Sequence, residues 1–202
     1  MNWFKQWLFK DRDGFTCNNN KLSVSIESIP ACSILLTHDR TLLGSAIRLT
    51  EERLDRSSIA RWNHSGLYLG GDKHETIEAM PDGVKVCRLE DSMVETCSFE
   101  VWKYAALTVT QASAIMDKAK SLVGDKYSYF DLTRLFIRAF MPVKIGRPPQ
   151  GQEICSEVVS IAWRASGLQW IDKDNYDVTP DDIGDFITRN QHLWVKVASW
   201  RC

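Results

Sequence analysis

The sequence lacks both the cysteine spacing of a metal site and any apolar run long enough to cross a membrane. Its six cysteines form no C-x-x-C pair and no set of zinc ligands. No stretch approaches the roughly eighteen apolar residues of a membrane-spanning helix. A chain of 202 residues can bury a core without disulfides. We therefore expect mostly reduced cysteines, a cytosolic origin, no metal and no cofactor.

The chain also has no excess of charge of either sign. The chain has 25 Lys and Arg against 26 Asp and Glu, which gives a net charge of −1. It has no basic cluster interleaved with aromatic residues, so nothing favours a nucleic-acid partner. The hydrophobic share of 44% and the charged share of 25% are ordinary for a globular protein, and there is no repeat or low-complexity tract. These features predict one folded domain.

The first ten residues are aromatic but do not have the form of a signal peptide. Lys5 and Gln6 interrupt the apolar stretch, and no small-residue cleavage site follows. We thus expect synthesis in the cytoplasm without a signal peptide. One helical face would carry Trp3, Phe4, Trp7 and Leu8. That face could lie on a membrane interface, contact a partner or pack on its own domain. Residues 1–28 are accordingly interpreted as an extension, and residues 29–202 as the domain.

A cysteine stands where an apolar helix is expected to begin. After Cys155, apolar residues repeat at helical spacing up to Ala165. Before it, the glycines and paired prolines of residues 146–151 prevent a helix. A helix N-terminus favours negative charge, so it would lower the pKa of the thiol and could hold an oxyanion. The alternative is a small buried hydrophobic residue, the commoner role of a free cysteine.

A histidine precedes this cysteine in a half-buried strand. Alternation places His64 on the face opposite Leu67 and Leu69. If the next strand forms a hairpin centred on Gly71, His64 lies opposite Glu78, which could orient the imidazole and stabilise its charge. A register shift of one residue would send Glu78 to the other face. The substitutes would then be Glu75, His74 and Asp72. Taken alone, His64 would be a hydrogen-bonded sheet residue and Glu78 a solvated one.

The remaining pattern predicts an α+β fold. Strands are expected near residues 33–37, 62–69, 75–79, 84–89, 98–108 and 193–199. Helices are expected over residues 111–123, 130–140 and 180–187, the first capped by Thr110 and the last by Thr179. In the second helix, Arg134 and Arg138 suggest a solvated face. Turned inward, they could meet a substrate carboxylate.

These features resemble the permuted papain-like cysteine hydrolases of the NlpC superfamily, and most of all their YiiX-like branch. The similarity rests on the run from His64 to Tyr68, on Gly124 and Tyr127, and on the run Cys155, Ser156, Glu157. It extends over residues 29–185. The chain departs from the family at Cys32 and Ser33, where Gly-Asp is usual, and at Ser128, where Asp is common. The lecithin:retinol acyltransferase branch fits less well, because its cysteine motif differs.

The resemblance implies a circularly permuted papain-like fold, in which an antiparallel sheet packs against the helix that bears the nucleophile. It assigns Cys155 as nucleophile, His64 as base and Glu78 as the third catalytic residue. The candidate substrate-binding residues are Tyr127, Trp62, Tyr68 and Ser156. The expected reaction is cleavage of an amide through an acyl-enzyme. Peptidoglycan stem peptide is the first expected substrate, and a phage-encoded lysis or virion protein would fit.

Two alternatives stay open. The same carbonyl chemistry would cleave a lipid ester or thioester, because only the shape of the pocket separates these substrates. The chain could also be a structural or assembly component, for instance of a phage particle, that retains the fold. Proximity of His64 and Cys155 is the feature that an enzyme needs and an inactive assembly component does not.

Overall fold

The structure is a computed structural model that describes residues 26–39, 45, 47, 49–50, 60–94, 96–140 and 151–201. The predicted apolar face of Trp3, Phe4, Trp7 and Leu8 lies outside these residues. Among the helices that are described, none is long and apolar enough to cross a bilayer.

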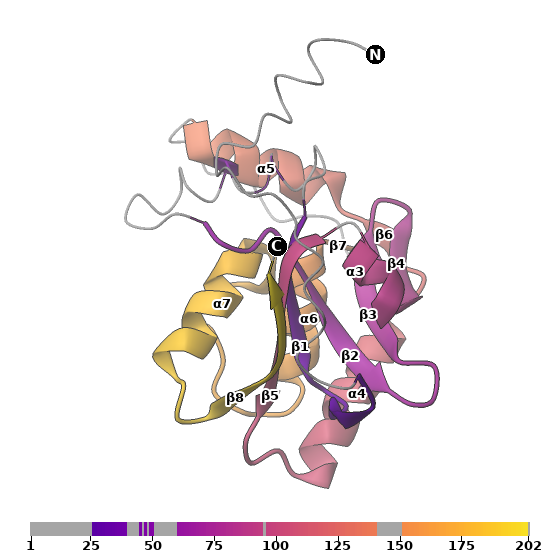
Figure 1. The fold of residues 1–202 in the computed structure, drawn as a ribbon. Coiled ribbons are helices and arrows are strands. Elements are labelled where there is room, and N and C mark those ends of the chain that lie inside the picture. Colours follow the sequence, from indigo (N-terminus) through magenta and orange to yellow (C-terminus); the bar gives the residue numbers. More distant parts are fainter. Residues whose placement is uncertain are drawn as a thin grey trace.

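A six-stranded antiparallel sheet forms the centre of the fold (Figure 1). Its strands in chain order are β1 (Ile34–Asp39), β2 (His64–Gly70), β3 (Glu75–Met80), β4 (Gly83–Arg88), β5 (Thr96–Tyr104) and β8 (Trp194–Arg201). Across the sheet the order is β4-β3-β2-β1-β5-β8. The sequence predicts all six strands to within a few residues, and the α+β class is confirmed.

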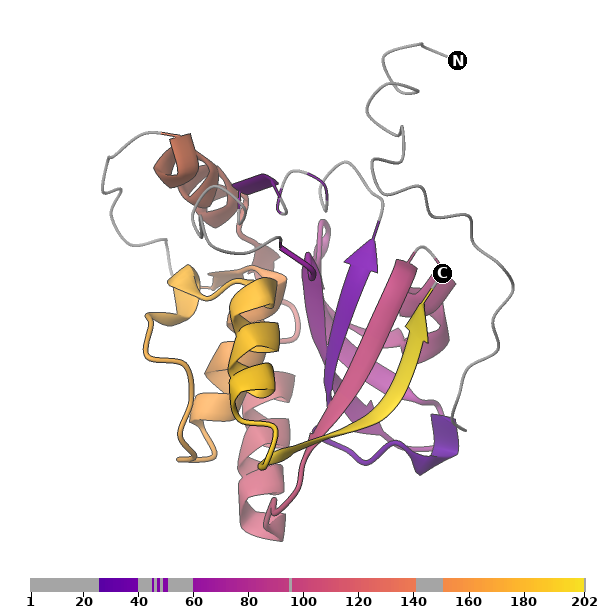
Figure 2. The same ribbon diagram turned by 60° about the vertical axis from the view of Figure 1, so that its left-hand side comes forward.

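Helices lie mainly on one face of this sheet (Figure 2). They are α3 (Leu89–Val94), α4 (Val109–Ser121), α5 (Tyr129–Phe140), α6 (Cys155–Arg164) and α7 (Pro180–Arg189). Two short strands, β6 (Lys126–Tyr127) and β7 (Gln152–Glu153), form a parallel pair, and β7 directly precedes α6 in the sequence. Two 3₁₀ turns, η1 (Ile26–Ser28) and η2 (Asn175–Asp177), complete the described elements. The packing of α4, α6 and α7 against the sheet buries the larger of two apolar clusters.

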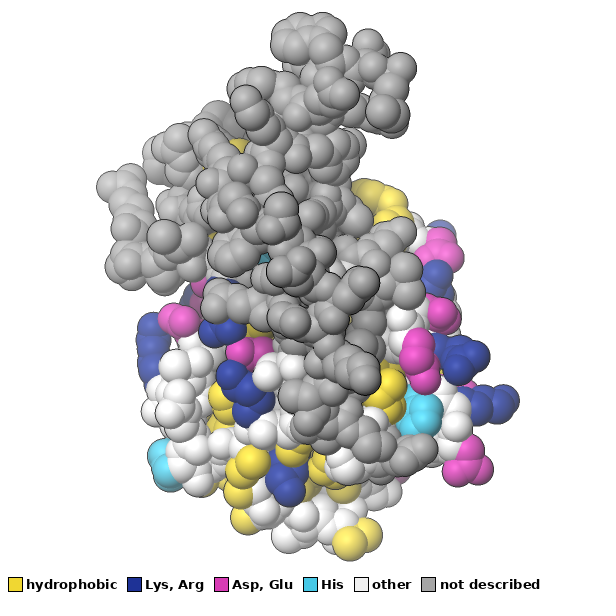
Figure 3. All heavy atoms as spheres, in the orientation of Figure 1, with side chains coloured by type: hydrophobic (Ala, Val, Ile, Leu, Met, Phe, Trp, Pro, Cys, Tyr) yellow, Lys and Arg dark blue, Asp and Glu magenta, His cyan; other side chains and the backbone are white. Residues whose placement is uncertain are grey.

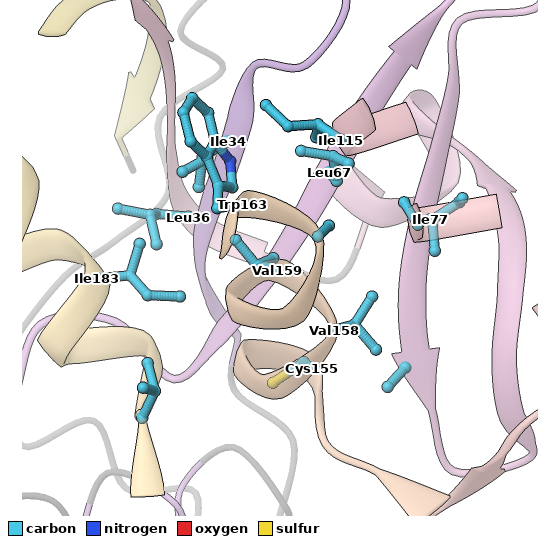
Figure 4. Packing of buried hydrophobic residues seen from close by; sticks show 14 of the residues in the cluster. Ile34, Leu36, Leu67, Ile77, Ile115, Cys155, Val158, Val159, Trp163 and Ile183 are labelled. Carbon is cyan, nitrogen blue, oxygen red and sulfur yellow. The ribbon is translucent and has the colours of Figure 1, made fainter. Parts of the chain in front are cut away.

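Strand alternation divides the core between the two faces of the sheet. Ile34 and Leu67 pack with Val158 and Val159 of α6 (Figure 4). Leu35 and Tyr68, the next residues along their strands, belong to the smaller cluster on the other face. Both faces are therefore buried over the middle strands, and α6 packs against one of them.

Of the two predicted helix N-caps, one is confirmed and the other is wrong. Thr179 caps α7, as predicted, with Pro180 at the start of the helix and Asp182 completing a capping box. For α4 the predicted cap Thr110 is wrong. Thr108 is the N-cap, because its hydroxyl accepts a hydrogen bond from the backbone N–H of Gln111, whose side chain in turn accepts from the backbone N–H of Thr108.

Basic and acidic side chains are interspersed over the described surface in Figure 3. Several form local pairs across one helical turn or one β-turn, such as Arg189 with Asp185 and Lys85 with Asp82. On this described surface no large area of one sign is seen, in agreement with the balanced composition.

Candidate active site

Three elements bring the predicted catalytic residues together. His64 is the first residue of β2, Glu78 lies in β3 and Cys155 is the first residue of α6. His64 Nε2 is 2.6 Å from Glu78 Oε2. Since Glu78 occupies Nε2, the other ring nitrogen, Nδ1, is the one left for Cys155. A hydrogen bond and charge interaction between Cys155 and His64 act on the imidazole.

The electrostatics of His64 favour its charged form. Burial, the largest single influence, lowers the pKa of His64. Charge attraction and a hydrogen bond from Cys155, followed by the hydrogen bond and charge of Glu78, outweigh burial and hold the pKa of His64 well above 6.5. An imidazole that readily accepts a proton beside a thiol is the arrangement that generates a thiolate–imidazolium pair.

The register between β2 and β3 differs from the predicted hairpin. Leu67 pairs with Ile77 and Tyr68 with Thr76, so that register places Glu78 opposite Gly66 rather than opposite His64. The reason is a longer turn with a bulge at Gly70. Because the shift amounts to two residues, Glu78 keeps the face shared with His64. Its side chain reaches His64 diagonally, across the position where Gly66 has no side chain.

Hydroxyl groups hold the other oxygen of Glu78. Thr76 Oγ1 donates to Glu78 Oε1 at 2.6 Å, and Ser92 Oγ of α3 donates to the same oxygen. Burial is the largest influence and raises the pKa of Glu78, but the bonds from His64, Ser92 and Thr76 together lower it. Glu78 is therefore a buried carboxylate whose charge is stabilised on both oxygens. Ser92 lies in no motif, so nothing in the sequence points to this contact.

The first turn of α6 leaves backbone donors near the thiol. Cys155 is only 2% exposed, and its sulfur lies at the first turn of the helix (Figure 4). The N-cap Ile154 has no side chain that could accept from the first-turn N–H groups. These groups carry the positive end of the helix dipole, which favours a thiolate or an oxyanion. The prediction that α6 begins at Cys155 is confirmed.

The four predicted substrate-binding side chains are all buried and occupied by structural contacts. Trp62 packs on α7, Ser156 Oγ donates to the carbonyl of Val178 at 2.7 Å, and Tyr68 OH lies 3.1 Å from His74 Nδ1. The ring of Tyr127 lies edge-on to Tyr129. A role for Tyr127, Trp62, Tyr68 or Ser156 in binding substrate stays a prediction.

A buried acidic cluster lies on the flank of α6, and the sequence analysis missed it. Glu153 and Glu157 are buried, and burial is the main cause that raises their pKa values to about 7 and about 8. Arg134 is buried beside them and pairs with Asp131 and Asp177. The predicted solvated face of α5 is therefore wrong at Arg134, because two carboxylates draw the guanidinium inward. The side chain of Arg138 lies outside the described part of the structure.

Neither a metal site nor a disulfide appears among the described residues. No group of three or more His, Cys, Asp and Glu in that part of the chain is arranged to hold a metal ion. Cys32, Cys87 and Cys155 are free thiols.

The arrangement of strands and helices is also found in a solved structure. That structure is the metalloprotein YiiX from Escherichia coli O157:H7, with 21% sequence identity and a TM-score of 0.50. The match covers 85% of this chain and 89% of that chain. The chain has a YiiX-like fold. No family model matches the sequence, and no curated protein matches it either.

The departure noted at Cys32 lies at an unusual backbone position. Cys32 stands where the resembling family has glycine, and its φ of 63° lies in the left-handed region that favours glycine. The buried thiol of Cys32 donates to the carbonyl of Ala112 at 3.4 Å, so the side chain is fixed in spite of the strained backbone. This substitution lies at the turn before β1, whereas His64 is opposite Thr37 further along that strand.

Proposed function

We propose that the protein is a cysteine hydrolase that cleaves an acyl bond through a covalent acyl-enzyme. The observation that carries the proposal is the interaction of His64 with both Cys155 and Glu78. Thiol, imidazole and carboxylate occur in the order of nucleophile, base and orienting group. A papain-like relation, with the histidine preceding the cysteine by permutation, is part of this proposal.

Each residue has one role in the proposed reaction. His64 takes the proton of Cys155, and the sulfur attacks the carbonyl carbon to give a tetrahedral oxyanion. The backbone N–H of Cys155 stabilises that oxyanion in part. The intermediate collapses, the bond to the leaving group breaks, and His64 returns the proton to it. Water, deprotonated by His64, then hydrolyses the thioester and regenerates the thiol.

The proposed bond is an amide, and the proposed substrate is a peptidoglycan stem peptide. The substrate rests on the sequence resemblance, because related hydrolases cut cell-wall peptides. Phage origin, in a lysis or virion protein, is the proposed setting. The apolar residues Trp3, Phe4, Trp7 and Leu8 would then contact a membrane interface or a partner. A lipid ester or thioester is the second substrate class, since the chemistry at the carbonyl is the same.

An assembly component that retains the fold is the rival proposal. An assembly component without enzymatic activity would not need a charged histidine beside a thiol. The buried, hydrogen-bonded Glu78 argues against it, because a buried carboxylate without a function is costly.

Alkylation by iodoacetamide between pH 5 and 9 tests the proposal, with wild type compared to His64→Ala. Cys155 should react well below pH 8 in wild type and lose that reactivity in the variant. Cys32 and Cys87 are internal controls, because burial raises the pKa of each thiol to about 11. If Cys155 reacts in both proteins no faster than these controls, the hydrolase proposal fails and the assembly role is favoured. If Cys155 instead reacts as expected, assays for cleavage of cell-wall peptides and of acyl lipids separate the two substrate classes.

A further inference from the structure

The catalytic carboxylate is held by residues that belong to no recognised motif. Glu78 is 2% exposed, and each of its two oxygens has separate partners. Oε2 meets His64, while Oε1 accepts from Thr76 of its own strand and from Ser92 of α3. A carboxyl group in an apolar surrounding would otherwise be free to turn or to take up a proton.

We propose that Ser92 and Thr76 are positioning residues that hold Glu78 in the one orientation in which it can orient His64. This inference rests on the proposed function for its role in catalysis. Neither hydroxyl interacts directly with Cys155 or His64, so each acts through Glu78. Ser92 is the more informative of the two, because it lies on α3, between β4 and β5, and so couples a short surface helix to the buried site.

Gly66 provides the space that this orientation needs. A Cβ atom at residue 66 would lie 2.7 Å from Cγ of Glu78 and 3.2 Å from its Cδ. The side chain of Glu78 thus lies across Gly66 on its way to His64. The hydroxyl groups of Ser92 and Thr76 hold one carboxylate oxygen, and the missing side chain at Gly66 leaves room for the rest of Glu78 to reach His64.

Other charged groups near Glu78 do not replace these donors. Lys85 of β4 interacts with Glu78 through its charge, and its ammonium group donates to Asp82. The thiol of Cys87 on the same strand stays neutral, because burial raises its pKa to about 11. His64, in turn, interacts with Cys155. Removing either hydroxyl would therefore leave Oε1 with one donor fewer in a buried surrounding.

The test compares wild type, Ser92→Ala, Ser92→Thr and Thr76→Val by two measurements. The first is the pH profile of Cys155 alkylation, and the second is the titration of His64 followed by NMR. Ser92→Ala should lower the pKa of His64 and slow alkylation at pH 6 by about tenfold, the effect of losing one hydrogen bond to a charged group. Ser92→Thr keeps a hydroxyl, so the pKa of His64 and the alkylation rate of Cys155 should both stay close to those of wild type. Thr76→Val should also lower the pKa of His64 and slow alkylation of Cys155. It replaces Ser92→Ala in the test if that variant does not fold.

Ser113→Ala is the matched control, because Ser113 also donates to a carboxylate, Asp117, but on the exposed surface of α4. It should change neither measurement. The proposal is overturned if folded Ser92→Ala and Thr76→Val titrate and react as wild type does. Should Cys155 be unreactive in wild type, the hydrolase proposal fails alone. A lowered pKa of His64 in Ser92→Ala would still support the positioning role.

Discussion

The side chain of Glu78 lies directly across Gly66, so that a Cβ at residue 66 would come within 2.7 Å of Glu78 Cγ. Gly66 has no unusual backbone conformation that requires glycine. Its small size is what matters, since any larger residue would occupy the path from β3 to His64.

Gly66→Ala should therefore abolish most of the thiol reactivity while leaving the fold intact. The added methyl group displaces Glu78, and His64 loses its orienting partner. We expect the alkylation rate of Cys155 at pH 6 to fall by at least about tenfold, as for loss of a charged hydrogen bond. Ser65→Ala is the neighbouring control, because its buried hydroxyl has no hydrogen-bond partner among the residues that the structure describes. An unchanged rate in Gly66→Ala would show that Glu78 does not need this path.

Glu78→Gln should lower the pKa of His64. The variant keeps the shape of the side chain but removes the charge that stabilises imidazolium. Since burial then opposes the charged form of His64 with less compensation, the reactivity of Cys155 should decline most at low pH. NMR titration of His64 and alkylation at several pH values measure the two effects. A pKa of His64 equal to that of wild type would contradict an electrostatic role for Glu78.

Glu157→Gln should stabilise the protein at alkaline pH. Burial, and then the charges of Asp131 and Glu153, raise the pKa of Glu157 from 4.5 to about 8. Between these values the unfolded chain releases the proton while the folded protein keeps it, so stability falls as pH rises. The gain in free energy of unfolding should grow by about 4 kcal/mol between pH 5 and pH 8.5.

Urea unfolding at both pH values measures this difference. Glu153→Gln should show a smaller gain that levels off at lower pH, because burial, the main cause, raises the pKa of Glu153 only to about 7. Parallel pH profiles of wild type and Glu157→Gln would mean that Glu157 is ionised in the folded protein.

Gly184→Ala should destabilise the packing of α7 on the sheet. A Cβ at residue 184 would lie 2.5 Å from Cδ1 of the buried Trp62. Overpacking of this kind costs about 1–3 kcal/mol, more than the helix propensity gained by alanine. Urea unfolding provides the measurement. Arg189→Ala on the same helix removes only an exposed ion pair and should cost less than about 1 kcal/mol. A stabilised Gly184→Ala would show that Trp62 can move aside.

Local patterns in the sequence were sufficient for the elements but not for their contacts. Alternation and helical spacing locate the six strands and the helix that begins at Cys155, because these signals depend on neighbouring residues only. They also place His64 and Glu78 on one face. The exact partner of Glu78 depends on turn length, and the longer turn at Gly70 moved it opposite Gly66.

Several contacts between distant segments could not be predicted from the sequence. Arg134 has the spacing of a surface residue, yet Asp177, far along the chain, pairs with it in the interior. Ser92 has no pattern at all, because its importance comes from a single hydrogen bond to β3. Trp62 lies two residues before His64 in the sequence, but it packs against Gly184 of α7. In each case the partner is chosen by tertiary packing rather than by local chemistry.

The meeting of His64 and Cys155 joins two parts of the molecule that fold from separate stretches of chain, the sheet and α6. A reactive thiol can thus exist only after α6 has docked on β2 and β3. Short pulses of iodoacetamide at pH 6 during refolding, followed by measurement of Cys155 alkylation, would therefore time the docking of α6.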